Sequence, residues 1–198
     1  VPSREVVSKR VSSLILLPDP TGWIFEDGSI CIDWADNNKS GKFDYGDTIY
    51  TLEMDGSYRT WFVQAFSVGP PVTVTLWRGS YIFHTRTAPV IKFVNELGQE
   101  VDTFDSYDAE YALKRGLVQD QAGSPMWMYY KPLFDQMSSD SFASNTTEPT
   151  AMSLAHLIDD AVEVSGNDLT INVGIPFPDT AFKQILSQTW GSIVSKQF

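Results

Sequence analysis

The chain has 198 residues, of which 42% are hydrophobic and 13% aromatic, so it can bury a substantial core and does not have a disordered composition. Its 25 acidic and 14 basic side chains give a formal charge of −11, which argues against nucleic acid as a partner. A single cysteine and two histidines exclude a disulfide framework and a zinc site of four Cys/His ligands. No apolar run is long enough to span a bilayer, and the start at Val1 predicts that the chain was cut from a longer one.

The first half of the chain is predicted to form strands. A short apolar run at 14–17 indicates a strand or a buried tether. The remaining predicted strands alternate apolar and polar residues and cover 30–34, 48–54, 58–66, 72–76, 81–83 and 89–94. Asp55-Gly56 and residues 78–80 are the predicted turns, so the sequence indicates an antiparallel meander.

From residue 105 onward the apolar residues follow a helical spacing. Helices are predicted at 105–117, 124–132, 150–162 and from 179, with a strand at 169–173 and a polar loop at 138–150. Asp105 is the expected N-cap of the first helix, and Pro132 is expected to end the second. We expect the first helix to pack its apolar stripe, which includes Leu113 and Leu117, on the strands at 72–76 and 81–83. Strands followed by interspersed helices indicate a single α+β domain over residues 1–198, an antiparallel sheet packed by several helices.

One motif predicts a specific chemistry. Residues 36–47 place oxygen-bearing side chains at loop positions 1, 3, 5, 9 and 12 and glycine at position 6, which is the spacing of an EF-hand calcium loop. Ca²⁺ takes six to eight oxygen ligands, and alternate residues of a tightly curled loop converge on one point. The predicted ligands are Asp36, Asn38, Ser40, the backbone carbonyl of Lys42, Asp44 through water, and Asp47. Phe43 is expected to anchor the loop in the core.

The loop departs from the helix-flanked EF-hand in two respects. Its flanks are predicted strands, and position 12 is Asp47 where the EF-hand has glutamate. It resembles the calcium loops of dockerins and other extracellular modules, and we treat 33–50 as a calcium-loop insertion with an affinity on the order of 10⁻⁴ M. The alternative is a solvated turn, because Asn, Asp and Gly favour turns without any metal.

A second pattern covers residues 58–198. The segments 81–86 (YIFHTR), 90–93 (VIKF) and 107–116 (YDAEYALKRG) resemble the F-x-x-R, V-K-F and A-E-D-V-x-Y-S-x-x-R signature of family 5 extracellular solute-binding proteins, the oligopeptide- and dipeptide-type receptors of ABC importers. Segments 117–128 and 184–196 are similar to members of the same family. The usual His-Asp-Gly is replaced at 94–99, and 1–57 has no counterpart in common members. The resemblance implies the small subdomain of the first lobe of a two-lobed receptor.

This resemblance implies non-catalytic capture of a peptide or oligosaccharide and its presentation to an ABC permease. It also implies an extracellular or cell-surface location, with membrane association through parts absent from this chain. Because a closing cleft needs walls from both lobes, the chain alone is not expected to bind a peptide or sugar tightly. The rival hypothesis is a calcium-stabilised cell-surface interaction or scaffolding module without a transport role.

Aromatic and titratable residues outside the loop receive simpler interpretations. Trp127, Tyr130 and Trp190 are weak candidates for ligand binding, because aromatic residues on helices more often belong to a core. His84 and His156 are interpreted as structural residues. No spacing marks a nucleophile–base pair or two catalytic carboxylates, so we identify no catalytic residue and expect no enzymatic activity.

Overall fold

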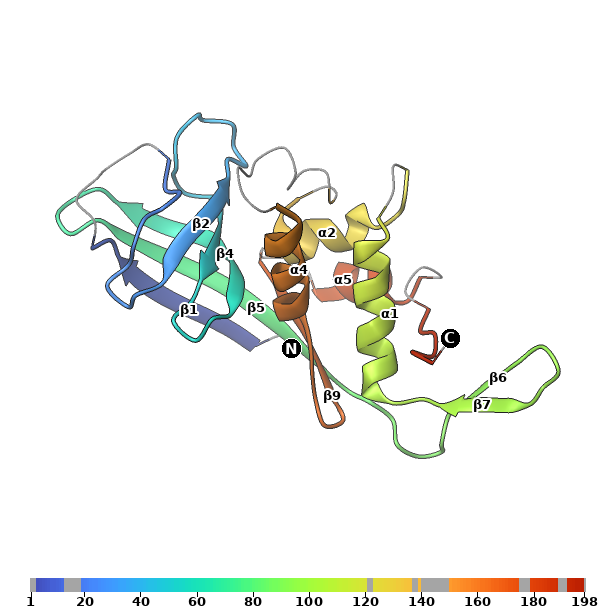
Figure 1. Cartoon of the computed structure of the whole chain (residues 1–198). Coiled ribbons are helices and arrows are strands. Elements are labelled where there is room, and N and C mark those ends of the chain that lie inside the picture. The colour runs from blue at the N-terminus through green and yellow to red at the C-terminus, as the bar shows by residue number, and fades with distance from the viewer. Residues whose placement is uncertain are drawn as a thin grey trace.

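The structure is a computed structural model that describes residues 3–12, 19–120, 123–136, 139, 150–174, 179–188 and 192–197. Its α+β class agrees with the sequence prediction: a curled antiparallel sheet is accompanied by helices gathered at one end (Figure 1). The strands are β1 (Ser3–Arg10), β2 (Ile30–Ala35), β3 (Thr48–Leu52), β4 (Tyr58–Ser67), β5 (Thr73–His84), β6 (Lys92–Val94), β7 (Glu100–Thr103), β8 (Val162–Ser165) and β9 (Asp168–Val173). The helices are α1 (Ser106–Val118), α2 (Trp127–Phe134), α4 (Thr150–Ala161) and α5 (Asp179–Leu186).

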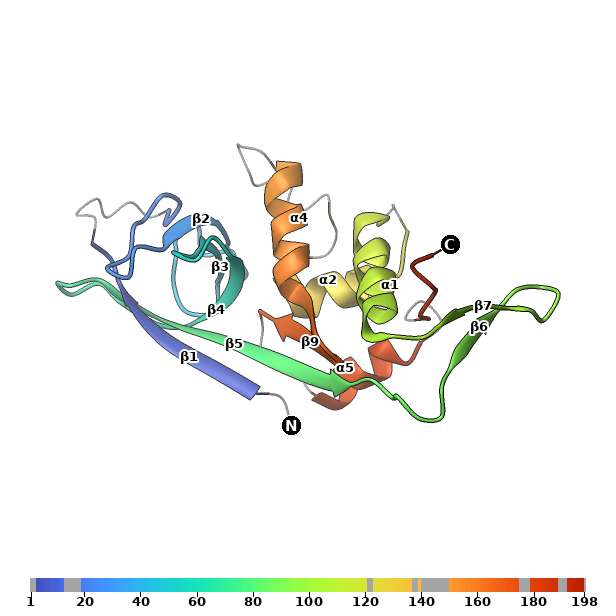
Figure 2. The ribbon, with the colours of Figure 1, turned by 60° about the horizontal axis from the view of Figure 1, so that its bottom comes forward.

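Strand β5 organises the main sheet. The hydrogen-bonded order is β2-β3-β4-β5-β9-β8, and β1 pairs with β5 along its other edge. On the edge opposite β1, the first half of β5 pairs with β4 and its second half, from Gly79 to His84, pairs with β9. Strands β6 and β7 form a separate two-stranded hairpin that projects from the body (Figure 2). One strand therefore belongs to both halves of the molecule.

The predicted turn at 78–80 was wrong, because β5 runs through it without interruption. Arg78 is buried at 6% exposure, lies 3.4 Å from Asp160 of α4, and stands 5.5 Å from the ring of Trp61. Gly79 pairs with residues on both sides of β5, and a Cβ there would lie 3.1 Å from the side chain of Val173. The glycine thus permits close strand packing, a role that sequence patterns do not distinguish from a turn.

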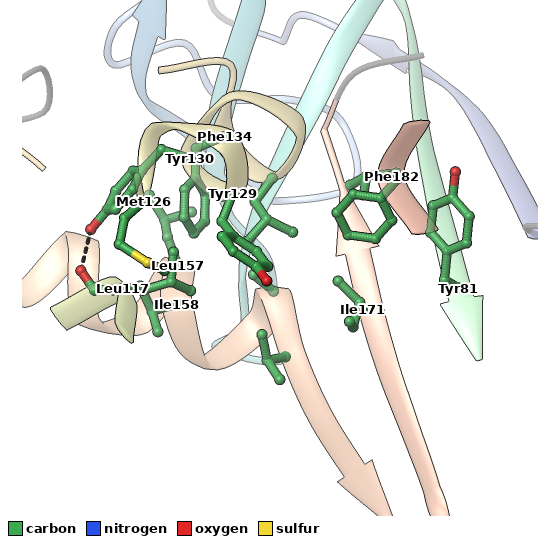
Figure 3. Close-up of a cluster of buried hydrophobic side chains, with 14 of the residues drawn as sticks. Tyr81, Leu117, Met126, Tyr129, Tyr130, Phe134, Leu157, Ile158, Ile171 and Phe182 are labelled. Carbon is green, nitrogen blue, oxygen red and sulfur yellow. Dashed lines mark hydrogen bonds between the residues drawn. The ribbon is translucent and has the colours of Figure 1, made fainter. Parts of the chain in front are cut away.

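Two hydrophobic clusters lie on either side of the curled sheet. The first, which we call the strand core, contains Val11, Trp23, Phe25, Cys31, Phe43, Ile49, Trp61, Val63, Val72, Val74 and Leu76. The second, the helix core, includes Tyr50, Tyr81, Leu117, Met126, Tyr129, Tyr130, Phe134, Leu157, Ile158, Ile171 and Phe182 (Figure 3). Because neighbouring residues of a strand face opposite sides, Ile49 of β3 enters the strand core while Tyr50 enters the helix core.

Helix α1 begins as predicted but packs on different strands. Asp105 is its N-cap and accepts a hydrogen bond from the backbone N–H of Asp108, whose side chain accepts one in return from Asp105. The expected packing on residues 72–76 was wrong, since the apolar residues there belong to the strand core. The helix instead contacts α4, β8 and β9, and of the expected partners Phe83 packs against the same core.

Further differences concern single elements. Strands β1, β7 and β8 were not predicted, and α2 continues through Pro132 to Phe134. The polar sequence of β1 gave no sign of a strand. Its Lys9, at 5% side-chain exposure, is buried because it pairs with Asp27 at 2.6 Å and with Glu53 at 2.9 Å. Residues 14–17 and most of the predicted loop 138–150 lie outside the described residues. None of the helices described here is long and apolar enough to cross a membrane.

The packing of α1 gives a matched pair of substitutions. Leu117 is 1% exposed, whereas Leu113 is only partly buried against the helix core. We expect Leu117→Ala to lower the free energy of unfolding by about 2–5 kcal/mol, because it leaves a cavity in a close-packed site. Leu113→Ala should cost less, about 1 kcal/mol. Urea unfolding followed by circular dichroism measures both, and equal losses would contradict this packing.

Candidate metal centre

The predicted calcium loop connects β2 to β3. These strands are antiparallel neighbours, and Ala35 at the end of β2 pairs with Thr48 at the start of β3. The loop therefore closes one end of this strand pair. Phe43 is 4% exposed and contacts the rings of Trp23 and Phe66, with centroids 5.5 and 5.1 Å away. The prediction that this phenylalanine anchors the loop in the core is confirmed. The loop is therefore attached to the strand core through Phe43, while residues 37–42 are exposed to solvent.

The start of the loop curls around one carboxylate. Asp36 accepts hydrogen bonds from the backbone N–H of Ser40 at 3.0 Å and of Gly41 at 2.7 Å, one on each oxygen. Gly41 has φ = +77°, a conformation that residues with a Cβ rarely adopt. Loop position 6 therefore bends where the calcium pattern requires glycine.

The middle of the loop joins the other predicted ligands in one network. Asn38 accepts a hydrogen bond from the N–H of Ser40 at 2.8 Å, and its amide donates to the carboxylate of Asp44. The hydroxyl of Ser40 donates to the carbonyl of Lys42 at 2.8 Å. Hydrogen bonds thus connect the oxygen-bearing groups of Asn38, Ser40, Lys42 and Asp44 within one short segment of the loop.

The last predicted ligand, Asp47, is a fully buried carboxylate. Its oxygens accept hydrogen bonds from the backbone N–H of Asn37 at 3.1 Å and of Asp44 at 2.8 Å. Burial raises the pKa of Asp47 to about 6; these backbone hydrogen bonds oppose that rise, and the nearby carboxylates of Asp44 and Asp36 add to it. Lys39 and Lys42 form no ion pair with any described residue. The three carboxylates of the loop are therefore not paired with its two lysines, and a bound cation would neutralise them.

The donor set fits Ca²⁺ in kind. Its carboxylates, amide, hydroxyl and backbone carbonyl are all oxygen donors, the type that calcium prefers. Within the described ranges no three acidic, histidine or cysteine side chains are close enough to form a metal cluster. The carboxylates of Asp36 and Asp47 instead accept hydrogen bonds from backbone N–H groups of the loop. To bind Ca²⁺, the carboxylates of Asp36 and Asp47 would have to replace some of these hydrogen bonds with contacts to the ion.

Sequence reasoning missed the contact that links the loop to the helices. The side-chain amide of Asn37, at loop position 2, donates to the carbonyl of Gly46 at 3.0 Å, to the hydroxyl of Thr48 at 3.1 Å and to the carboxylate of Asp135. Thr48 in turn donates to Asp135 at 2.9 Å. Asp135 is the C-cap of α2, is 8% exposed, and also pairs with Lys131. Because Asn37 and Asp135 lie far apart in the chain, no local pattern could have paired them.

Of the weak ligand-binding candidates, the structure describes Tyr130 and Trp127, and these two differ in exposure. Tyr130 is completely buried, and its hydroxyl donates to the carbonyl of Leu117 at 2.7 Å (Figure 3). Trp127 is 46% exposed. Trp190 lies outside the described residues. His84 pairs with Asp168 at 2.6 Å on the surface.

His156 stacks on the ring of Tyr58 with centroids 4.6 Å apart.

Comparison of the chain with family models, with curated proteins and with solved structures found no match. The family resemblance of residues 58–198 and the calcium chemistry of the loop both stay predictions.

The contact between Asn37 and Asp135 can be tested by truncating the amide. We expect Asn37→Ala to lower the free energy of unfolding by about 1–3 kcal/mol, because the buried carboxylate of Asp135 loses a donor. Gln64→Ala removes an exposed amide from β4 and should change the stability by no more than about 0.5 kcal/mol. Urea unfolding measures both, and equal effects of the two substitutions would show that the contact contributes nothing.

Proposed function

We propose that this chain is a calcium-stabilised, non-catalytic part of an extracellular solute receptor. The observation that carries the calcium assignment is the loop at 36–47, which curls around Asp36 and ends on the buried carboxylate of Asp47. The receptor assignment rests on the resemblance of residues 58–198 to family 5 solute-binding proteins. The two assignments are separable, and each has its own test.

The ion would be held by the loop's own residues. Asp36, Asn38, Ser40, the carbonyl of Lys42 and Asp47 would bind it directly, and Asp44 through water. Calcium would supply positive charge next to the buried Asp47 and replace backbone donors around it. Its role would be structural, because the loop joins two paired strands and contacts the end of α2 through Asn37. An affinity on the order of 10⁻⁴ M suits the calcium concentrations outside cells.

The receptor proposal is supported by the sequence resemblance, whose three motifs fall on different elements of the structure. The segment 81–86 covers the end of β5, 90–93 enters β6, and 107–116 lies within α1, so the three motifs follow one another along one end of the molecule (Figure 2). The proposed activity of the full-length receptor is capture of a peptide or oligosaccharide and its delivery to an ABC permease. This part supplies no catalytic step.

A specific observation favours the second candidate, a calcium-stabilised surface interaction or scaffolding module. The β6–β7 hairpin and the segment before it expose apolar side chains, including Val90 at 57%, Val94 at 61% and Leu97 at 81%. Such residues on a projecting hairpin are typical of a surface that contacts another protein. A second lobe in the parent chain would favour the receptor, and an adhesive or repeat region would favour the scaffold.

Calcium binding is tested by calorimetric titration and thermal unfolding. We expect one Ca²⁺ per chain and, at a tenfold excess of free calcium over the dissociation constant, a stabilisation of about 1.4 kcal/mol. Asp36→Asn should weaken binding at least tenfold, because it removes a charge from the ligand set. Asp55→Asn is the matched control, since Asp55 lies in the β3–β4 turn and bonds Ser57 there. An unmodified chain that gives neither heat nor a thermal shift with millimolar Ca²⁺ would refute the calcium assignment.

The receptor assignment predicts a contrast between the chain and its parent. The isolated chain should bind no peptide or oligosaccharide with sub-micromolar affinity, because the wall formed by a second lobe is missing. The parent chain should bind one. Titration of both proteins against the same peptide and sugar panel measures this, and tight binding by the isolated chain would contradict the proposal.

A further inference from the structure

An apolar cavity lies in a part of the molecule that the calcium loop does not reach. It has a volume of about 280 Å³ and is lined by residues from the end of β5, from β9, from α1 and from α5. The end of β5 pairs with the start of β9, and Figure 2 shows where these elements lie. Its walls include Phe83, Phe104, Leu113, Leu169, Ile171 and Leu186. Small-molecule sites are typically concave, mostly apolar and supplied with a few polar groups that fix orientation. This cavity is concave and mostly apolar. The residues at its rim determine which polar groups a ligand would meet.

The rim carries an arginine without a partner among the residues that the structure describes. Arg86 follows β5, lines the cavity, is exposed, and forms no ion pair or hydrogen bond with any residue described in the structure. The lysines that line the groove on the other side of α1 are all engaged: Lys114 lies 2.9 Å from both Glu110 and Asp159, and Lys196 lies 2.9 Å from Asp105. A guanidinium presents a planar set of donors that matches a carboxylate. Arg86 is thus the positive group available to a ligand at this cavity.

A histidine beside the arginine is held in a fixed orientation. Nδ1 of His84 lies 2.6 Å from the carboxylate of Asp168, so this pair uses one ring nitrogen and leaves Nε2 for another partner. The hydroxyl of Thr85 donates to the carbonyl of Asn167 at 2.7 Å. Among the described residues of the rim, Arg86 is therefore an unpaired cation and His84 an oriented imidazole, both next to an apolar interior.

We propose that this cavity binds a small amphiphilic carboxylate, with its apolar tail between α1 and the sheet and its carboxylate on Arg86. At ~30 Å³ for each water-sized group, the volume accommodates a tail of roughly eight to ten carbon atoms. The positive rim selects against amines, and an alcohol of the same length lacks the charge that pairs with the guanidinium. This inference does not depend on calcium binding or on a second lobe, because every residue it uses belongs to this chain and lies outside the loop.

The test maps decanoate binding to the full chain by methyl NMR. We expect submillimolar affinity, with shift changes concentrated at the methyl groups of Leu113, Ile171 and Leu186 and absent from those of Ile49 and Leu76 in the strand core. Arg86→Gln should weaken decanoate binding at least tenfold. Arg115→Gln is the matched control, because Arg115 is an exposed arginine of α1 outside the cavity, and it should leave binding unchanged.

Two further probes separate a built site from surfactant-like adsorption. Decan-1-ol should bind at least tenfold more weakly than decanoate, and Leu113→Phe should block the tail while the thermal unfolding curve shows a folded protein. Shifts spread over both cores, equal binding of the alcohol, or full affinity in Arg86→Gln would overturn the proposal. Because the chain can fail this test and still bind Ca²⁺ or belong to a receptor, the outcome leaves the proposed function to its own experiments.

Discussion

Strand β5 is the constraint on which the rest of the structure depends. Its first half forms part of the sheet around the strand core, and its second half pairs with β9 beneath the helices (Figure 1). Arg78, near the middle of the strand, lies over Trp61 and pairs with Asp160 of α4, so one buried cation contacts both halves. Burial raises the pKa of Asp160 to about 6, while the neighbouring Arg78 opposes that rise. The two cores are therefore joined by the backbone of β5 and by the buried guanidinium of Arg78.

The candidate calcium loop links the two cores at a second place. Phe43 fixes the loop to the strand core, whereas Asn37 and Thr48 reach Asp135 at the end of α2. Immediately after the loop, the hydroxyl of Tyr50 donates to the carbonyl of Phe134 at 2.6 Å. An ion in the loop would hold the start of β3 in place, and β3 is buried on both faces. A calcium ion bound there would stabilise the junction between the two cores.

Local signals were sufficient for much of this arrangement. The alternation of β2 to β4, the N-cap at Asp105 and the glycine at position 41 each depend on neighbouring residues, so the sequence alone predicts them. The predictions failed where a distant residue decides the outcome. Arg78-Gly79-Ser80 has turn composition, but it is held in an extended strand by pairing with β1 and β9 and by the contact of Arg78 with Asp160. Strand β1 was missed because its sequence is polar, and its Lys9 can be buried only because the distant Asp27 and Glu53 neutralise it. The contact of Asn37 with Asp135 likewise has no local signature.

The most direct test of this account is a crystal structure of the chain grown with millimolar Ca²⁺, with anomalous scattering used to locate the ion. The account predicts one peak inside the loop, with oxygen atoms of Asp36, Asn38, Ser40, Lys42 and Asp47 at about 2.3–2.6 Å from it. It also predicts that Asn37 still contacts Asp135 in that crystal. A loop without a peak, or an ion bound at another acidic site of this strongly negative chain, would contradict the central claim.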